Sequence, residues 1–378
     1  MRIGIDVFSL DKPGENYGVG IGVYVWKLLP ELIKQGKHHQ FIIFANNDNK
    51  DLIPKGENVT IHVSPVSNKF RFLRIIHEQL YLPFQFIRNK LNIIHFLGIN
   101  ISLLLSSRSI ITIHDLMWKY YYDMGNRSPK FIYYRLISPF SIKKGKGIIT
   151  VSRFIAKEIG STYMRTINVY PIHEGPGDCV KPSIIDITSY AQKYNYKYIY
   201  TVTTSMPHKN LKVLLEAFLK LKRNNSFDGK LVITGQLKGN FHKRTLKFIS
   251  DNHLEKDIIL TGFIYSKEKT YCYQNALLFV FPSFYEGFGL PLLEAMNLGV
   301  PILAANSASL PEVGEDACLY FDPNSSDDLY DKITYLINDT KKQKEMIERG
   351  KTQSEKFSWE KTAYETLTVY KKVFEFEK

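Results

Sequence analysis

The feature that most constrains this chain is a regular alternation of short apolar segments with helical patterns, which runs twice along the sequence. The first series contains β-branched segments such as RIGIDVF, FIIFAN and SIITIHD, separated by patterns such as GVYVWKLLPELIK. The second series contains YIYTVTT, KLVITG and ALLFVFPS. Strands that are apolar on both faces and alternate with helices indicate parallel, doubly wound sheets. The sequence therefore predicts an α/β protein with two Rossmann-like domains.

A break between the two series falls in the segment VYPIHEGPGDCVKPS, residues 169–183, which collects prolines and glycines. A length of 378 residues with 44% hydrophobic residues also suits two cores better than one. We expect residues 1–175 to form the first domain and residues 176–357 the second. Residues 358–378 carry apolar side chains at helical spacing, which predicts a closing helix.

The net charge of +13 is unevenly distributed. Residues 1–175 hold 23 Lys and Arg against 12 Asp and Glu, a net +11, whereas residues 176–378 hold 27 against 25, a net +2. A basic half is compatible with nucleic acid, an anionic membrane or an anionic small substrate. We expect no nucleic acid partner, because no helix-turn-helix, zinc-finger or ribonucleoprotein motif is present. Aromatic residues interleave with cations in residues 69–76 and 117–124, so peripheral contact with an anionic membrane stays open beside core packing.

The cysteines and the hydropathy of the sequence indicate the cellular compartment in which the protein is expected. Three scattered cysteines, Cys179, Cys272 and Cys318, make neither a disulfide framework nor a zinc site. The most apolar stretch, residues 91–105, is too short and too polar to span a bilayer, which takes about 20 apolar residues. The first residues show no secretory cleavage pattern. We therefore expect a cytoplasmic protein, with the inner face of the membrane as the place of any peripheral contact.

Two carboxylates follow one strand of the second series, in the segment FPSFYEGFGLPLLEAM. Ligands of open α/β sheets bind outside the carboxyl ends of strands. Glu286 is expected in the loop and Glu294 in the following helix, whose free amides near Gly289 and Leu290 suit anions or sugar hydroxyls. A polyhydroxylated ligand would pair such carboxylates through charge-assisted hydrogen bonds. The alternative is that Glu294 only complements the helix dipole and Glu286 is a solvated loop residue.

Two other loops after strands carry phosphate-binding chemistry. Lys209, in the segment SMPHKNLKVLLEAF, stands where a helix begins and would complete a diphosphate site, unless it is merely solvated. The segment YGVGIGVY follows the first strand and lets the backbone approach a phosphate. Its glycines lack the dinucleotide-binding spacing, so as a motif it is weak.

Residues 281–323 resemble the signature of glycosyltransferase family 4, a group of retaining enzymes with the GT-B fold, and Glu286 and Glu294 match its Glu-x7-Glu motif. Other segments agree, among them GIGVY, EQLYLPF, IITIHDL, IITVSRF and HKNLKVLLEAF, so the resemblance covers nearly the whole chain. It implies two facing Rossmann-like domains. The first would receive the acceptor and the second a nucleotide-diphosphate sugar, with the closing helix crossing back to the first domain.

The resemblance also implies roles for single residues. Glu294 would bind the ribose hydroxyls, and Glu286 would hold the transferred sugar and stabilise positive charge at its anomeric carbon. Lys209 would neutralise the leaving diphosphate. His114, at the end of a strand in IITIHDL, would contact the sugar, although a histidine at such a place is otherwise most often a satisfied buried residue. The remaining donor contacts would come from the backbone, at Phe288, Gly289 and Leu290 for sugar and diphosphate, Ile264 for the base, and Gly20 and Gly22 for the phosphates.

The sequence departs from the family pattern in two loops. Thr203, Thr204 and Ser205 stand where many relatives have an arginine, and Val23 replaces an arginine of the first loop. The diphosphate contact would then depend more on Lys209 and backbone amides.

The expected activity is metal-independent transfer of a hexose to a saccharide or lipid-linked glycan, with retention of configuration. Stabilising the leaving group does not require a metal ion, and no Asp-x-Asp is present to hold one. No cofactor is expected. Relatives with similar segments are often mannosyltransferases, which slightly favours mannose as the sugar. A catalytically silent sugar-nucleotide-binding partner protein and a nucleotide-sugar epimerase stay open as alternatives.

Overall fold

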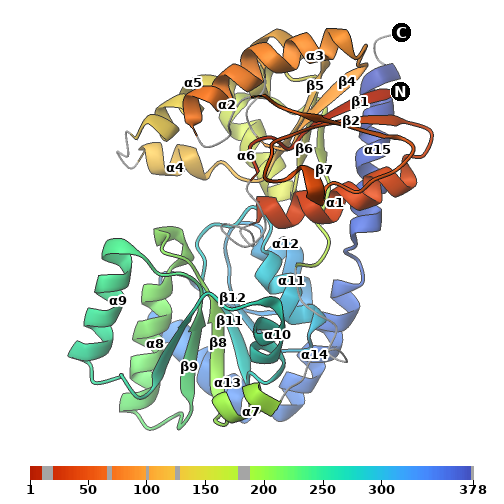
Figure 1. The fold of residues 1–378 in the computed structure, drawn as a ribbon. Helices are drawn as coiled ribbons and strands as arrows, with labels where there is room; N and C mark the ends of the chain where they lie inside the picture. Colours follow the sequence, from red (N-terminus) through yellow and green to blue (C-terminus); the bar gives the residue numbers. More distant parts are fainter. Residues whose placement is uncertain (11–19, 66–69, 99–101, 124–127, 178–187, 376–378) are drawn as a thin grey trace. The chain divides into compact units, whose positions relative to one another are not determined.

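The computed structural model describes the chain except for residues 11–19, 66–69, 99–101, 124–127, 178–187 and 376–378. The chain divides into two compact units: unit 1 is Met1–Gly175 with Phe357–Lys378, and unit 2 is Pro176–Lys356. Each unit is built on one parallel sheet covered by helices (Figure 1). The prediction of two Rossmann-like parallel-sheet domains is confirmed.

The sheet of unit 1 has seven parallel strands in the order β3-β2-β1-β4-β5-β6-β7. The order reverses between β1 and β4, and open α/β sheets bind ligands at the carboxyl edge of such a reversal point. The central strands are buried along their whole length, as their uninterrupted apolar runs predict. The strands are β1 (Arg2–Asp6), β2 (Gln40–Ala45), β3 (Val59–Val63), β4 (Ile93–Phe96), β5 (Ser109–Ile113), β6 (Gly147–Thr150) and β7 (Val169–Pro171).

Strand β7 lies in the segment that the prolines and glycines had suggested as a break. It pairs with β6 in the register Ile148↔Val169 and Thr150↔Pro171. Three residues are too short to show a strand period, and Pro171 is tolerated because β7 is an edge strand with no further neighbour. The irregular connection between the units therefore begins only after Pro171.

The helices of unit 1 include a continuous helical stretch from Arg71 to Arg88, whose middle turn is a π-helix. The last helix of the chain, α15, contacts α1 and β6 of unit 1 and buries Trp359, Ala363, Leu367 and Tyr370. The helices are α1 (Ile21–Gln35), α2 (Arg71–Ile76), η2 (His77–Tyr81, the π-helix), α3 (Leu82–Arg88), α4 (Met117–Asp123), α5 (Pro129–Lys144), α6 (Arg153–Tyr163) and α15 (Trp359–Glu375), with the 3-10 turns η1 (Lys50–Leu52) and η3 (Leu103–Arg108).

The sheet of unit 2 has six parallel strands in the order β10-β9-β8-β11-β12-β13. Strands β8 and β11 are neighbours at the point where the order reverses, so the loops that follow them share one edge. The strands are β8 (Tyr198–Val202), β9 (Lys230–Thr234), β10 (Ile258–Gly262), β11 (Leu278–Phe281), β12 (Ile302–Ala305) and β13 (Leu319–Phe321).

Helices cover both faces of this second sheet (Figure 1). Helix α8 has a strongly apolar face, with Leu211, Leu214, Leu215 and Phe218 buried as the sequence pattern predicts. The helices are α7 (Thr188–Lys193), α8 (Leu211–Arg223), α9 (Gly239–Asp251), α10 (Ser266–Gln274), α11 (Leu290–Asn297), α12 (Leu310–Gly314), α13 (Ser326–Asn338) and α14 (Thr340–Ser354), with the 3-10 turns η5 (Pro207–Lys209) and η6 (Glu315–Ala317).

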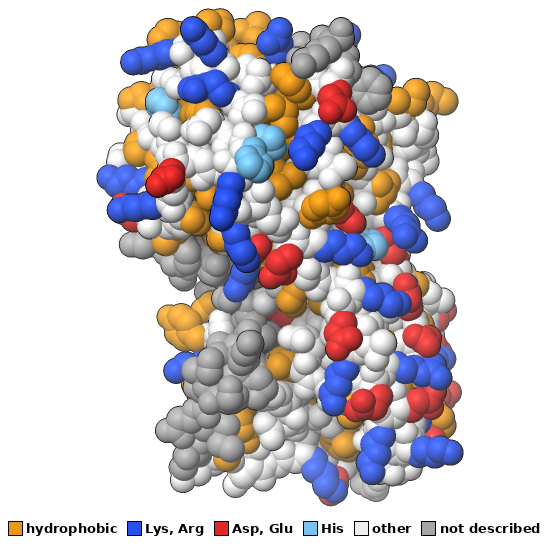
Figure 2. Space-filling view, turned by 90° about the vertical axis from the view of Figure 1, so that its right-hand side faces the viewer, with side chains coloured by type: hydrophobic (Ala, Val, Ile, Leu, Met, Phe, Trp, Pro, Cys, Tyr) orange, Lys and Arg blue, Asp and Glu red, His pale blue; other side chains and the backbone are white. Residues whose placement is uncertain are grey.

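The charge asymmetry of the sequence is visible on the surface. On the face shown in Figure 2, blue Lys and Arg side chains outnumber red Asp and Glu over unit 1, whereas the two kinds intermingle over unit 2. In the described parts of the chain, no helix combines the length and the hydropathy that crossing a membrane requires. The same described residues contain no group of three His, Cys, Asp or Glu side chains placed to hold a metal ion.

Candidate active site

The loops after β8 and β11 bring Lys209 and Glu286 together. Lys209 ends the short turn η5, and Glu286 lies between β11 and α11. The Nζ atom of Lys209 is 2.6 Å from Oε1 of Glu286, and the two side chains are 17% and 13% exposed. The backbone amide of Phe284 donates to the carbonyl of His208 at 2.8 Å and joins the two loops directly. Two of the residues singled out from the sequence thus form one partly buried ion pair.

His208, next to Lys209, does not add a second cation. Burial and, to a lesser extent, the neighbouring charge of Lys209 lower the pKa of His208 to about 4. The imidazole is therefore neutral near pH 7, and Lys209 supplies the positive charge of this loop.

The turn from Glu286 into α11 is held by Ser309, which lies in the connection between β12 and α12. Oγ of Ser309 lies 2.9 Å from the carbonyl oxygen of Glu286 and 2.8 Å from that of Phe288, so its hydroxyl can donate to either. Gly289 caps the helix with φ of +110°, and a Cβ there would lie 2.9 Å from a methyl carbon of Leu310. A side chain at Gly289 would therefore be strained. The amides of Phe288, Gly289 and Leu290 occupy this fixed turn at the start of α11.

Glu294, one turn into α11, is buried and has two partners from α10. Nζ of Lys269 is 2.8 Å from Oε1 of Glu294, and the hydroxyl of Tyr273 donates to Oε2 at 3.1 Å. The sequence reasoning missed both partners. Lys269 and Tyr273 are four residues apart on one helix face, but nothing in that spacing reveals that the face meets α11.

The start of unit 2 also touches Glu294. A Cβ on Gly177 would lie 2.1 Å from Oε1 of Glu294, so the backbone of this segment passes directly over the carboxylate. Only glycine permits this approach, since any side chain would overlap the oxygen. In the sequence, Gly177 was one of the glycines and prolines that predicted a break between the domains. In the structure, its lack of a side chain leaves space for the Glu294 carboxylate.

Ile264, the expected base-binding position, follows β10 and is buried. Its neighbours Phe263 and Tyr265 are both exposed, and their ring centroids are 5.4 Å apart in an edge-to-face arrangement. Two exposed aromatic rings beside a buried backbone segment form a surface on which a flat base can stack.

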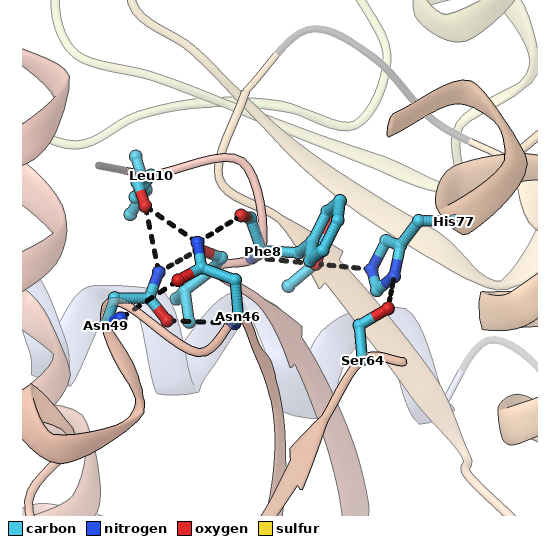
Figure 3. A network of polar contacts seen from close by, with 8 residues as sticks. Phe8, Leu10, Asn46, Asn49, Ser64 and His77 are labelled. Atoms are coloured by element: carbon cyan, nitrogen blue, oxygen red, sulfur yellow. Dashed lines mark hydrogen bonds and ion pairs between the residues drawn. The ribbon is translucent and has the colours of Figure 1, made fainter. Parts of the chain in front are cut away.

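In unit 1, two asparagines fix the chain where β1 leads into the glycine-rich loop (Figure 3). Nδ2 of Asn46 donates to the carbonyls of Phe8 and Leu10 at 2.7 and 3.0 Å. Nδ2 of Asn49 donates to the carbonyls of Val7 and Leu10 at 2.8 and 3.0 Å. The part of the loop at residues 11–19 lies outside the described residues.

The far end of the same loop leads into α1. Gly20 caps α1 with φ of +29°, and Gly22 lies in its first turn. The expected phosphate contacts of these two glycines stay predictions.

A buried histidine ties β1 to β3 beside these asparagines (Figure 3). Nε2 of His77 is 3.2 Å from Oδ1 of Asp6, and Nδ1 is 2.9 Å from Oγ of Ser64. The His77 ring also stacks on Phe8 with centroids 3.8 Å apart. A carboxylate only accepts, so Nε2 carries a proton, and a neutral ring then accepts the hydroxyl proton of Ser64 at Nδ1. These contacts position the end of β1, from which the loop departs.

His114 directly follows β5, at the carboxyl edge of the first sheet. Its Nε2 is 3.2 Å from the carbonyl oxygen of Leu97, and its Nδ1 is 3.6 Å from Oε1 of Glu174. Both ring nitrogens therefore already face acceptors within unit 1. The sugar contact expected of His114 stays a prediction, and such a contact would have to displace one of these acceptors.

Comparison with known proteins agrees with this architecture. Residues 19–175 match the family model described as Glycosyltransferase Family 4, and residues 185–353 match the model described as Glycosyl transferases group 1. The chain is 33% identical over 241 residues to O-antigen chain mannosyltransferase B of Escherichia coli, a match that covers 61% of this chain and 62% of that protein. It is 28% identical over 280 residues to the serotype-specific mannosyltransferase WbdA of Escherichia coli, covering 72% of this chain but 34% of the relative.

The matched segments thus span between a third and two thirds of these relatives' own length. Among solved structures, HepE of Anabaena in complex with UDP and glucose aligns with a TM-score of 0.69 at 16% identity, covering 100% of this chain and 99% of that one. This likeness concerns the fold. With both halves of the chain matched by the models that describe its two domains, the chain belongs to the group 1, family 4 glycosyltransferases.

Proposed function

We propose that the chain is a retaining hexosyltransferase that uses a nucleotide-diphosphate sugar as donor and needs no metal ion. The observation that carries this proposal is the ion pair between Lys209 and Glu286 at the carboxyl edge of β8 and β11, beside the amino terminus of α11. A cation and the backbone amides at a helix start suit the negative diphosphate, and a carboxylate suits the positive charge that develops on the sugar.

The reaction breaks the bond between the anomeric carbon and the diphosphate oxygen. Negative charge develops on the diphosphate, where Lys209 and the amides of the α11 turn would stabilise it. Positive charge develops at the anomeric carbon, where the Glu286 carboxylate would stabilise it. The acceptor hydroxyl oxygen forms the new bond on the same face, and its proton passes to the departing phosphate. With the lysine placed to neutralise the diphosphate, the step as written requires no metal.

Mannose is the proposed sugar, because the two relatives quoted above are named as mannosyltransferases. The proposed acceptor is a saccharide or a lipid-linked glycan, since one of these relatives acts on an O-antigen chain by name. Glu294 would bind the ribose hydroxyls, and the buried backbone at Ile264 with the ring of Tyr265 would hold the base.

The decisive experiment is an incubation with guanosine, uridine and adenosine diphosphate hexoses, with and without saccharide acceptors. Release of nucleoside diphosphate with one donor, retained when a chelator is present, is the expected result. A silent sugar-nucleotide-binding protein would release none above background. An epimerase would convert the donor to another sugar nucleotide without releasing nucleotide, which the same reaction mixture reveals on analysis of the donor.

We also propose that unit 1 contacts an anionic membrane through the surface formed by η2, α3, η3 and α5. Residues 69–146 contain 13 Lys and Arg against 3 Asp and Glu, a net +10 of the +11 carried by residues 1–175. Within this segment the amide of Leu103 donates to Oε1 of Gln79 at 2.9 Å, and the hydroxyl of Tyr133 donates to Oε2 of Glu78 at 3.1 Å. These bonds show that the π-helix, η3 and α5 adjoin.

The same elements expose large apolar side chains. Leu80, Phe84 and Ile87 follow one another at helical spacing and are 65%, 59% and 77% exposed, and Leu104 and Leu136 are 73% and 70% exposed. Apolar side chains surrounded by cations suit the interface of a bilayer that contains anionic lipid, where each Lys or Arg contributes about 1 kcal/mol. Such a surface would bring a lipid-linked acceptor to the unit that is expected to receive it.

A further inference from the structure

The carboxylate of Glu174 is buried within unit 1 and faces the imidazole of His114, with the Tyr24 hydroxyl as a further titratable group that its charge affects. Glu174 is 3% exposed, and Oε1 lies 3.6 Å from Nδ1 of His114. A buried carboxylate is costly unless it is paired, so the contact with His114 compensates for the burial. The sequence reasoning assigned no role to Glu174, because it falls in the glycine- and proline-rich connection at residues 169–183.

The two contacts of His114 together define where its protons are. The carbonyl of Leu97 can only accept, so Nε2 carries a proton that is donated over 3.2 Å. The other nitrogen, Nδ1, faces a carboxylate oxygen, and this contact is favourable only if a proton lies between the two atoms. The carboxylate of Glu174 therefore favours a proton on Nδ1 of His114.

The surroundings leave little freedom to this pair. The ring of Tyr24 on α1 packs edge-on against His114 with centroids 4.7 Å apart, and it also contacts Trp359 at 5.7 Å. His95 on β4 also lies near His114, and burial together with His114 lowers the pKa of His95 to about 3, so it is neutral. Burial likewise raises the pKa of the Glu174 carboxyl, and the nearby His114 offsets part of that effect.

The backbone of Glu174 is fixed as firmly as its side chain. The hydroxyl of Thr362 donates to the carbonyl of His173 at 2.8 Å. Trp359 lies so close to Gly175 that a Cβ there would be 2.6 Å from the Trp359 backbone nitrogen. The first turn of α15 thus contacts both chain neighbours of Glu174, His173 and Gly175. His114 directly follows β5, which positions its backbone.

We propose that Glu174 is a positioning residue for His114: by favouring a proton at Nδ1, it fixes the ring orientation, so that Nε2–H points to the sheet edge and can exchange the Leu97 carbonyl for a sugar hydroxyl. This inference rests on the proposed function for the identity of the ligand. Without Glu174, the ring can turn over or take the other tautomer, and the donor is lost from its place at the sheet edge.

The experiment compares Glu174→Gln with Glu57→Gln, a matched change at an exposed glutamate. Nitrogen NMR of histidine-labelled protein reports ring protonation directly, with His114 identified by the signal lost in His114→Asn. In Glu174→Gln we expect the Nδ1 signal of His114 to move to the position of an unprotonated nitrogen, whereas Glu57→Gln leaves it unchanged. Glu174→Asp, which keeps the charge, should restore the signal in part. An unchanged His114 ring in Glu174→Gln overturns the proposal, whether or not transfer activity has been found.

A second readout uses activity. If the chain transfers hexose, Glu174→Gln should lower kcat by roughly ten- to a hundred-fold, the range known for carboxylates that orient histidines in metal sites. The KM for the donor should stay near that of the unmodified protein, and the pH dependence of kcat should change. Equal loss of kcat in Glu174→Gln and Glu174→Asp, with an unaltered pH profile, would show a purely structural role and contradict the proposal.

Discussion

The ammonium of Lys209 lies 2.6 Å from the carboxylate of Glu286, so the cation expected to meet the diphosphate and the acid expected to meet the sugar neutralise each other. A donor that binds here would replace this contact with its own charges, the phosphates taking the lysine and the sugar hydroxyls taking the carboxylate. The pair is therefore preorganised for a ligand that carries both kinds of group side by side.

Replacing Lys209 tests this arrangement. Lys209→Met should weaken nucleoside diphosphate binding by about 1.5–3 kcal/mol, the scale of a hydrogen bond to a charged group, because Glu286 is then left to repel the phosphates. Calorimetric titration with the diphosphate of the accepted donor measures the change. Lys212→Met is the control, since its side chain is 83% exposed and pairs with Glu216 on the same helix. Equal affinity in both variants would remove Lys209 from the donor site.

Glu294 is predicted to recognise the ribose. Glu294→Ala should weaken donor binding by about 1.5–3 kcal/mol, because a charged hydrogen-bond acceptor is lost. A 2′-deoxy nucleotide separates this role from folding: it should bind more weakly than the ribonucleotide to the unmodified protein, but equally well to Glu294→Ala. Both titrations use the same protein preparation. Undiminished discrimination in the variant would show that the ribose is recognised elsewhere.

Gly177 offers a test in which no charged residue is replaced. Gly177→Ala puts a methyl group on the Glu294 carboxylate, so the side chain must move away from Lys269 and Tyr273. We expect weaker nucleotide binding and a lower midpoint of thermal unfolding. Gly350→Ala is the matched control in unit 2, because its new Cβ would lie 3.5 Å from the nearest atom, an ordinary contact. Wild-type affinity in Gly177→Ala contradicts the prediction.

His95 should make the protein less stable in acid. Burial and, to a lesser extent, the nearby His114 lower its pKa to about 3, whereas in the unfolded chain it titrates near 6.5. Between these two values the unfolded chain binds a proton that the folded chain does not. The free energy of unfolding therefore falls as the pH falls through this window, by about 1 kcal/mol per pH unit from this group.

Denaturant unfolding at pH 7.5 and 5.5 measures the effect. His95→Gln should show a smaller loss of stability between the two values than the unmodified protein. His38→Gln, at an exposed position, should keep the full loss. The prediction fails if both variants lose as much stability as the unmodified chain.

The membrane surface is tested by sedimentation with vesicles. The unmodified chain should bind phosphatidylcholine vesicles only when they contain phosphatidylglycerol, and salt should weaken the binding. The double change of Phe84 and Ile87 to serine should reduce it strongly, since both side chains are more than half exposed. Tyr364→Ser, which alters an exposed aromatic side chain on α15, serves as the control. Binding that ignores lipid charge, or that survives the double change, would contradict the proposed membrane surface.

The sequence predicted those features that depend on local periodicity or on the ends of parallel strands. The two sheets follow from uninterrupted apolar runs. The places of Lys209 and Glu286 in loops at the carboxyl ends of strands were predicted, whereas their direct ion pair was not. Lys269, Tyr273 and Glu174 escaped prediction because their roles arise from contacts between elements that are not neighbours in sequence. Strand β7 was not predicted, because its three residues are too few to show the alternation of a strand and end in a proline.

The packing of Trp359 on Gly175 has a consequence for how the chain is assembled. Unit 2 leaves unit 1 after Gly175 and returns at Phe357, and the backbones of Gly175 and Trp359 nearly touch. In topological terms, unit 2 is a cassette inserted at a single point of unit 1. If unit 2 binds the donor, as proposed, an exchange of this cassette between homologous chains that keeps its two ends side by side would change the activated sugar and leave the core of unit 1 intact.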